Sequence, residues 1–298
     1  MPNPTVPERD TPADCEANYN LRARHPDALT LMAGWQRHAA QARETLAYCA
    51  DERFGETAHE SIDVFPAARR AAPAVLFIHG GYWQAGDKHD VSFVAPLLVQ
   101  RGIAVAINNY ALAPDASLDT MVAQTRKALH WLHRHAARFG IDANRLYVMG
   151  HSAGGHLAAM MLTTHGVANS VANGVAAPVR AAIALSGVFD LVPLVNTSIN
   201  RALGLDEASA QRLSPARLVR HSDSPIHTLV GDGETRGFHE QRTLLSRQWP
   251  GVRHLAPVAG RHHYDILDLF REPGNAWLES IAGIVSGTPN ASNAGRVL

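Results

Sequence analysis

Residues 150–154, with the sequence Gly-His-Ser-Ala-Gly, constrain the fold of this chain more than any other stretch. The apolar run 145–149 precedes them and predicts a buried strand, while residues 155–162 suit a helix. A sharp strand-to-helix turn between two glycines would hold the hydroxyl of Ser152 exposed at the edge of a sheet. A serine hydroxyl is a weak nucleophile unless it is held in this way beside a base, so Ser152 is the candidate nucleophile.

A Gly-x-Ser-x-Gly pattern alone also fits an ordinary packing turn, and its context decides between the two interpretations. Here the strand before the turn and the helix after it are the context that nucleophilic catalysis demands. The helix would also place its positive dipole end and the N–H of Ala153 next to the serine. We therefore favour the catalytic interpretation.

Apolar runs alternate with helix-compatible stretches along the chain, which predicts a mostly parallel central sheet with helices on both faces. The expected strands are 61–65, 74–78, 103–107, 145–149, 181–185, 226–230 and 252–258, and the expected helices are 27–50, 93–100, 118–139, 155–162, 238–248 and 275–285. Residues 190–222 are expected to connect two strands through short helical pieces around 199–203 and 215–220. Together with the serine turn, this order predicts the α/β-hydrolase fold.

A single domain over residues 1–298 is expected, because parallel α/β architectures often reach this length without splitting. Residues 1–20 are rich in proline and charge and are predicted to be extended. Residues 21–58 are predicted to form an N-terminal helical segment that either packs on the sheet or roofs a pocket. The Gly/Ser/Asn-rich tail, 287–298, is expected to be flexible.

Composition argues against several classes of partner. Basic and acidic residues number 27 each, so neither nucleic acid nor an anionic membrane surface is expected as a partner. The first residues lack the apolar stretch of a secretion signal, and Cys15 and Cys49 stand outside any metal or redox spacing, which favours the cytoplasm. Most of the seventeen histidines lack an Asp, Glu or Cys in ligand spacing, and several lie on what is expected to be a solvated helix face, so metal binding is not expected. No organic cofactor is expected either, and a homodimer is left open.

The apolar run 74–78 delivers the sequence His79-Gly-Gly-Tyr-Trp to a strand end, where ligands of open α/β sheets bind. Backbone N–H groups of Gly81 and Tyr82, joined by that of Ala153, are the candidate donors to a substrate oxyanion. The rings of Tyr82, Trp83 and Tyr110 could stack on an aryl substrate or serve only for packing.

A serine nucleophile needs a histidine and a carboxylate, which follow it in the order acid, then histidine, in α/β-hydrolases. The last two expected strands end close to suitable residues. Asp232 and Glu234 both follow the first of them, and His262 and His263 follow the second. From the residues alone either acid and either histidine could serve.

Four segments together resemble the serine-type kynurenine formamidases, or arylformamidases, of the α/β-hydrolase fold. They are His79-Gly-Gly-Tyr-Trp-Gln-Ala-Gly-Asp-Lys88, Gly150-His-Ser-Ala-Gly-Gly-His-Leu157, Glu234 with the following Phe238-His-Glu-Gln241, and His263-Tyr-Asp-Ile266. Residues 19–24 also resemble the family's N-terminal segment, so the likeness runs from about residue 19 to 285.

The resemblance implies that Ser152, Glu234 and His263 form a catalytic triad. It also implies hydrolysis of N-formyl-L-kynurenine to L-kynurenine and formate, a step of tryptophan catabolism, without a cofactor. Two positions depart from the family pattern: Glu234 stands where Asp is frequent, and His262 where relatives often have Asp. A longer carboxylate can still orient an imidazole, whereas the second change leaves room for a shifted substrate preference.

Two other functions compete with this expectation. A carboxylesterase acting on small acyl or aryl esters would use the same triad, because fold and triad do not fix the leaving group. A small-molecule binding protein on an inactive hydrolase scaffold is the rival from another class, and the presence of serine, acid and histidine candidates argues against it.

Overall fold

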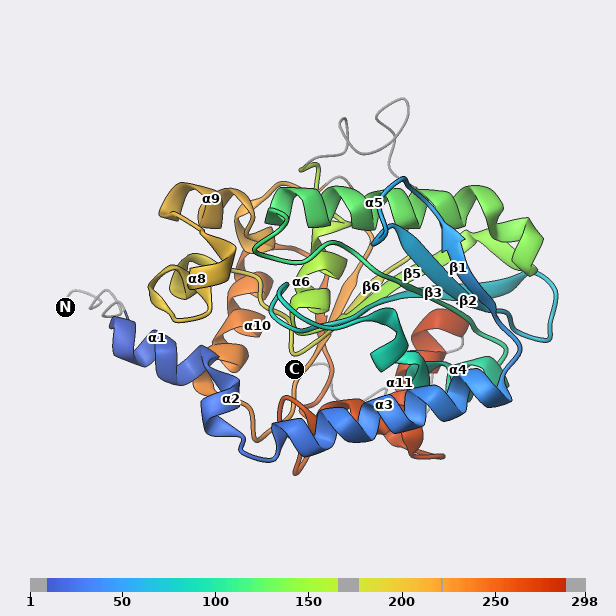
Figure 1. Ribbon diagram of the computed structural model, residues 1–298, viewed down its shortest axis with the longest axis horizontal. Helices are drawn as coiled ribbons and strands as arrows, with labels where there is room; N and C mark the ends of the chain where they lie inside the picture. Colours follow the sequence, from blue (N-terminus) through green and yellow to red (C-terminus); the bar gives the residue numbers. More distant parts are fainter. Residues whose placement is uncertain (1–9, 166–176, 221, 288–298) are drawn as a thin grey trace.

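The computed structural model describes residues 10–165, 177–220 and 222–287, in which one eight-stranded sheet is covered by helices on both faces (Figure 1). The strands are β1 (Cys49–Arg53), β2 (Ser61–Phe65), β3 (Ala72–Ile78), β4 (Ala104–Asn108), β5 (Ile141–His151), β6 (Ala182–Leu185), β7 (Ile226–Leu229) and β8 (Val252–His254). The α-helices are α1 (Pro12–Tyr19), α2 (Leu21–Arg24), α3 (Ala28–Thr45), α4 (Ala95–Gln100), α5 (Leu118–His135), α6 (Ala153–Met160), α8 (Asn200–Leu203), α9 (Glu207–Arg212), α10 (Arg236–Gln248) and α11 (Ala276–Ser286). Short 3-10 helices are η1 (Lys88–Asp90), η2 (Ser92–Val94), η3 (Ala136–Phe139), η5 (Val192–Asn196), η6 (Pro215–Arg217) and η7 (Asp265–Arg271).

The sheet order is β1-β2-β4-β3-β5-β6-β7-β8, with β2 antiparallel to its neighbours and every pair from β4 to β8 parallel. Figure 1 shows α5 and α6 on one side of the sheet, α4 and α11 on the other, and α3 running along that second side. This arrangement confirms the predicted mostly parallel α/β sheet. In the described ranges, no helix combines the length and apolarity that crossing a bilayer requires.

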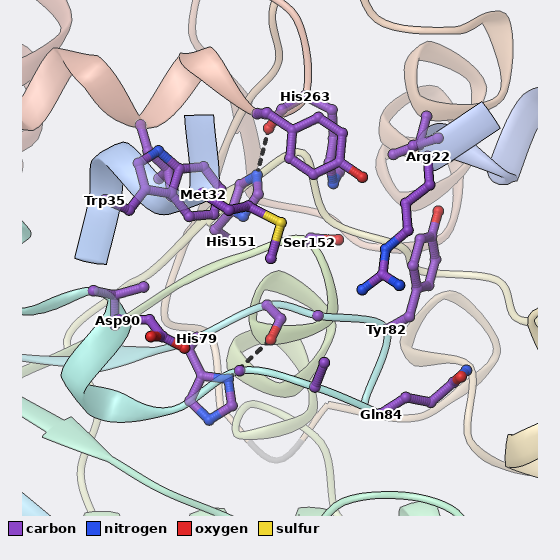
Figure 2. A pocket seen from close by; sticks show the side chains of 18 of the residues that line it. Arg22, Met32, Trp35, His79, Tyr82, Gln84, Asp90, His151, Ser152 and His263 are labelled. Atoms are coloured by element: carbon purple, nitrogen blue, oxygen red, sulfur yellow. Dashed lines mark hydrogen bonds between the residues drawn. The ribbon is translucent and has the colours of Figure 1, made fainter. Parts of the chain in front are cut away.

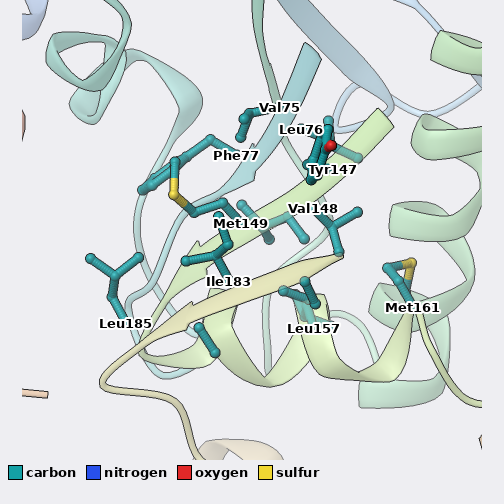
Figure 3. Close-up of a cluster of buried hydrophobic side chains, with 14 of the residues drawn as sticks. Val75, Leu76, Phe77, Tyr147, Val148, Met149, Leu157, Met161, Ile183 and Leu185 are labelled. Atoms are coloured by element: carbon teal, nitrogen blue, oxygen red, sulfur yellow. The ribbon is translucent and has the colours of Figure 1, made fainter. Parts of the chain in front are cut away.

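The core fills both faces of the central strands, and α6 covers one of these faces (Figure 3). All seven residues of β3 are buried, as a strand that is covered on both faces requires. The labelled side chains of this cluster are Val75, Leu76, Phe77, Tyr147, Val148, Met149, Leu157, Met161, Ile183 and Leu185. Burial of this apolar surface is the main favourable contribution to folding, and it holds the carboxyl ends of the central strands in one plane.

The register aligns those strand ends. Ile78 of β3 pairs with Gly150 of β5, and His151 pairs with Leu185 of β6. Leu185 in turn pairs with Leu229 of β7. The loops that follow these four strands therefore leave the sheet at one edge and at one level.

Two expectations for the N-terminal region were wrong. The segment predicted to be extended, 1–20, contains α1, because Thr11 and Asp14 form a capping box and Pro12 occupies the first helical position. The helix expected over 27–50 ends at Thr45, and Cys49 begins β1, which pairs with β2 at the edge of the sheet. Residues 1–9 and 288–298, which include nearly all of the expected tail, lie outside the described residues.

A buried ion pair fastens the loop after β3 to the sheet. The Nζ of Lys88 is 2.7 Å from Oδ1 of Asp63 and 2.7 Å from Oδ1 of Asp51. Lys88 and Asp63 are almost fully buried, whereas the Asp51 side chain is 65% exposed. The Lys88 N–H also donates to Oδ1 of Asn109, which follows β4. The loop is therefore tied to two strands at its far end.

Asp63→Asn should lower the free energy of unfolding by about 3 kcal/mol, because it leaves the buried ammonium of Lys88 with one carboxylate, the solvent-screened Asp51, to balance its charge. The matched change Asp51→Asn should cost less than about 1 kcal/mol, since that carboxylate is exposed. Urea denaturation of both variants measures the difference. Equal losses would show that the two carboxylates contribute alike.

Two buried histidines make folding sensitive to acid. Burial lowers the pKa of His156 to about 4, opposed by its hydrogen bond to the Leu213 carbonyl oxygen. Burial likewise lowers the pKa of His227 to about 4. Between pH 6.5 and 4 the unfolded chain binds protons at these rings that the folded protein does not, so stability falls as the pH falls through this window.

Replacing His227 with Gln should make this fall shallower, by up to about 1.4 kcal/mol for each pH unit below 6.5. The free energy of unfolding, measured in urea at pH 7, 6 and 5, provides the comparison with the unsubstituted protein. Parallel pH profiles for the two proteins would contradict the prediction.

Candidate active site

The turn that carries Ser152 is built around two close backbone approaches. Ser152 has φ 57° and ψ −119°, a conformation that non-glycine residues rarely adopt. A Cβ on Gly150 would lie 2.1 Å from the carbonyl oxygen of Gly154, and one on Gly154 would lie 2.0 Å from the carbonyl oxygen of Ile78. Only glycine fits either position, and the strained serine is placed at the start of α6.

His263 and Glu234 meet at the same edge of the sheet. The Nδ1 of His263 is 3.1 Å from Oε2 of Glu234, and both residues are buried. The hydroxyl of Ser186, which follows β6, donates to the other carboxylate oxygen, Oε1. A carboxylate held by two partners in a buried site can fix the orientation of an imidazole.

Two further contacts hold His263 in place. Its carbonyl oxygen accepts a hydrogen bond of 2.8 Å from Nε2 of His151, the residue before Ser152 (Figure 2). Its ring packs against that of Phe238 on α10, with centroids 4.6 Å apart. Burial, followed by the charge of His263, keeps the pKa of His151 well below its ordinary value, so His151 is neutral when it makes this contact.

The other acid and the other histidine have different surroundings. Asp232 is exposed, and its Oδ1 accepts the N–H of Gly260 at 2.8 Å, a contact between two loops. His262 lies 3.7 Å from Asp27 and 3.6 Å from Asp265 through Nε2, and its ring stacks on His25. Of the candidates that the sequence left open, the structure brings Glu234 and His263 together.

The loop after β3 turns back on itself beside Ser152. Gly81, Tyr82 and Trp83 all have positive φ, and a Cβ on Gly81 would lie 2.1 Å from the carbonyl oxygen of Ala85. A Cβ on Gly80 would lie 3.2 Å from Cβ of Ser152. The backbone of this loop therefore approaches the serine as closely as a glycine allows.

A cavity of about 360 Å³ opens above Ser152 and His263. Figure 2 shows Met32 and Trp35 on one side of it and Arg22 and Tyr82 on the other. The lining residues are Asn20, Leu21, Arg22, Met32, Trp35, Gln36, His79, Gly80, Gly81, Tyr82, Gln84, Ala85, Gly86, Asp87, Asp90, Val91, His151, Ser152, Ser198, Ile199, His263, Tyr264 and Leu267. This volume suits a ligand of one aromatic ring with side chains.

The N-terminal segment forms part of the cavity wall. Leu21 and Arg22 come from α2, and Met32 and Trp35 come from α3. Of the two roles weighed for this segment, lining the pocket is therefore the one that its contacts favour. Arg22 and Met32 were not predicted as site residues, although Arg22 lies in the stretch 19–24 that resembles the family's N-terminal segment.

Two of the three aromatic residues expected in the pocket lie elsewhere. Trp83 is fully buried beneath the loop and packs edge-on against His156, with centroids 5.1 Å apart. Tyr110 is buried as well: it stacks on His79 and donates to the carbonyl oxygen of that residue at 2.9 Å. Neither lines the cavity, because each ring supports the loop from within, whereas Tyr82 does line it.

Two groups of side chains in the described part of the chain come close enough to share a metal ion. The group Asp51, Asp63 and His89 already surrounds the ammonium of Lys88. In the group His25, Asp27 and His262, Nδ1 of His262 accepts the N–H of Tyr264, which turns a protonated Nε2 towards the carboxylates. The first group therefore already holds the ammonium of Lys88, whereas Nε2 of His25 in the second group is buried without a hydrogen-bond partner among the described residues.

Comparison with known proteins places this site in a family. The model of the BD-FAE family matches residues 62–248. The kynurenine formamidase of Salmo salar is 36% identical over 227 residues, which cover 72% of this chain and 74% of that protein. The kynurenine formamidase of Drosophila melanogaster is 31% identical over 236 residues, covering 77% of this chain and 75% of that protein.

A solved structure supports the fold over nearly the whole chain. It belongs to a candidate thioesterase from Silicibacter sp. tm1040, is 26% identical, and superposes with a TM-score of 0.79 over 92% of this chain and 99% of that one. The α/β-hydrolase sheet, the matched motifs and the 31–36% identity to the two kynurenine formamidases support the same assignment. The chain is a hydrolase that belongs to the kynurenine formamidase family.

Proposed function

We propose that the protein hydrolyses N-formyl-L-kynurenine to L-kynurenine and formate, with Ser152 as nucleophile, His263 as general base and Glu234 as the acid of the triad. The observation that carries the proposal is the buried contact of 3.1 Å between His263 and Glu234 beside a cavity that Ser152 also lines. The choice of N-formyl-L-kynurenine as the substrate rests on the relatives named kynurenine formamidase.

In the first half-reaction, Oγ of Ser152 bonds to the formyl carbon while Nε2 of His263 takes the hydroxyl proton. Glu234 accepts the Nδ1–H of His263, which selects the tautomer with a free Nε2 and stabilises the imidazolium. The tetrahedral intermediate then breaks its C–N bond, and His263 gives its proton to the departing aryl nitrogen. The products of this step are the aryl amine and a formyl ester on Ser152.

In the second half-reaction, water attacks the formyl carbon and His263 takes its proton. The ester bond breaks, the proton returns to Oγ of Ser152, and formate leaves. All three side chains come from one chain, so this chemistry does not depend on a homodimer. The free cysteines, Cys15 and Cys49, are in keeping with the cytoplasm as the proposed compartment.

The oxyanion of each intermediate is proposed to accept hydrogen bonds from the backbone N–H groups of Gly81, Tyr82 and Ala153. The positive φ angles of Gly81 and Tyr82 and the position of Ala153 at the start of α6 support this assignment. Prearranged donors of this kind stabilise the charge that develops in the transition state and require no reorganisation at that moment.

The acid assignment gives a paired prediction. Glu234→Gln should lower kcat by about 10³-fold or more, because an amide holds the imidazole in the wrong tautomer. Asp232→Asn should change kcat by less than about threefold, since the exposed Asp232 side chain accepts a loop N–H, and among the described residues it makes no contact with His263. Steady-state kinetics on both purified variants provide the measurement. A larger loss in Asp232→Asn would transfer the role of the acid to Asp232.

A carboxylesterase remains the second candidate, favoured by the likeness to a candidate thioesterase. A formyl group is the smallest acyl group, so a pocket too short for a methyl group beside the reacting carbon would favour it over larger acyl groups. We expect a higher kcat/KM for N-formyl-L-kynurenine than for phenyl acetate or p-nitrophenyl butyrate, assayed side by side with Ser152→Ala as the blank. Equal or faster turnover of the butyrate would favour the esterase.

A further inference from the structure

Arg22 stands out among the charged residues of the cavity because no residue in the described part of the chain pairs with it. Within the described residues it makes no hydrogen bond and no salt bridge, although its side chain extends into the cavity (Figure 2). The two cavity carboxylates are both occupied: Asp87 accepts from Nδ2 of Asn109 at 2.7 Å, and Asp90 accepts from Nε2 of Gln36 at 2.9 Å. Arg22 therefore offers an unpaired guanidinium to a ligand.

The backbone below Arg22 is fixed by contacts to the rest of the site. Leu21 is buried, and the side chain of Asn20 caps α2 by accepting the N–H of Ala23 at 3.3 Å. The carbonyl oxygen of Tyr19 accepts the hydroxyl of Tyr82, in the loop next to Ser152, at 2.5 Å. Arg22 thus lies on α2, directly after the end of α1 at Tyr19, which is hydrogen-bonded to the proposed oxyanion loop.

A second donor that has no partner among the described residues acts on the same part of the cavity as the guanidinium. The hydroxyl of Tyr264 makes no hydrogen bond to any residue in the described ranges, and Tyr264 also lines the cavity. Burial raises the pKa of Tyr264 while the charge of Arg22 lowers it, and burial prevails, so the hydroxyl keeps its proton. The charge of Asp27 raises the pKa of the same hydroxyl. The Asp27 carboxylate itself lies beside His262, with Oδ2 3.7 Å from Nε2.

The side of the cavity opposite Arg22 carries large apolar side chains. Met32 and Trp35 face the cavity on the side opposite Arg22, and Leu267 adds to the lining. An aryl ring can pack there while a charged group on the same molecule reaches the guanidinium. A planar guanidinium beside a hydroxyl is the donor set that suits a carboxylate, which can accept two parallel N–H bonds.

We propose that Arg22, assisted by the hydroxyl of Tyr264, binds a carboxylate on the substrate and so selects aryl formamides that carry an acidic side chain over neutral ones. The inference rests on the proposed function and deepens it, because N-formyl-L-kynurenine bears such a carboxylate on the chain ortho to its formamide. The subsite acts on recognition, and the chemistry at Ser152 is independent of it.

The test compares N-formyl-L-kynurenine with 2′-formamidoacetophenone, a neutral compound that keeps the ring, the ketone and the formamide but lacks the amino-acid group. Arg22→Ala should lower the ratio of their kcat/KM values by about tenfold or more, mainly by raising KM for the charged substrate. Arg22→Lys should retain part of the ratio, because it keeps the charge and loses the planar fork. Tyr264→Phe should lower the ratio by a smaller factor.

The matched control is Arg24→Ala, since Arg24 lies on the same short helix, is exposed and does not line the cavity. Its substrate ratio should equal that of the unsubstituted protein, and thermal melts should show that every variant is folded. An unchanged ratio in Arg22→Ala, or an equal fall in Arg24→Ala, would overturn the proposal.

Failure of the proposed function gives a different result. If the unsubstituted protein cleaves neither formamide, the proposed function is wrong. The carboxylate subsite is then tested with two esters, by the ratio of kcat/KM for 3-acetoxybenzoate to that for phenyl acetate. A tenfold fall of this second ratio in Arg22→Ala still supports a carboxylate subsite, and an unchanged ratio rejects it.

Discussion

The site depends on how closely helix α6 approaches strands β3 and β5. Gly150 and Gly154 have no room for a Cβ, since the nearest carbonyl oxygens would be 2.1 and 2.0 Å from it. A Cβ on Gly155 would lie 2.9 Å from the Cα of Gly187. The close packing at these three glycines places the start of α6 directly above the ends of the central strands. The positive φ of Ser152 is tolerated because the surrounding backbone, anchored by the buried strands, leaves the turn no alternative.

From that point the other parts of the site are held by polar contacts between loops of neighbouring strands. Ser186 after β6 binds Glu234 after β7, Glu234 binds His263 after β8, and the His263 carbonyl oxygen binds His151 at the end of β5. Each contact joins loops that the strand register has already brought to one level. Buried polar groups that are satisfied in this manner fix a single geometry, because any alternative would leave a donor or acceptor unpaired.

The sequence was most informative where its pattern is local and least informative where a contact is distant. The strand over Ser61–Phe65 and the turn at Ser152 follow from apolar runs and glycine spacing, and both are found as predicted. Helix α1 was missed because proline and charge were taken to indicate an extended chain, although Thr11 and Asp14 carry the signature of a capping box. The burial of Trp83 and Tyr110, and the unpaired state of Arg22, are set by packing between distant segments, which residue spacing does not encode.

The N-terminal helices contact parts of the chain that are more than two hundred residues away. Asn18 accepts the N–H of Gly237 through its side chain and the hydroxyl of Thr235 through its carbonyl, and the hydroxyl of Tyr19 accepts a bond from Gln241. During synthesis on a ribosome these helices emerge long before their partners Thr235, Gly237 and Gln241 at α10. The cavity wall can therefore be completed only after α10 has been made, so a nascent chain passes through a stage in which the N-terminal helices and the serine turn have both been made but the contacts to α10 have not yet formed.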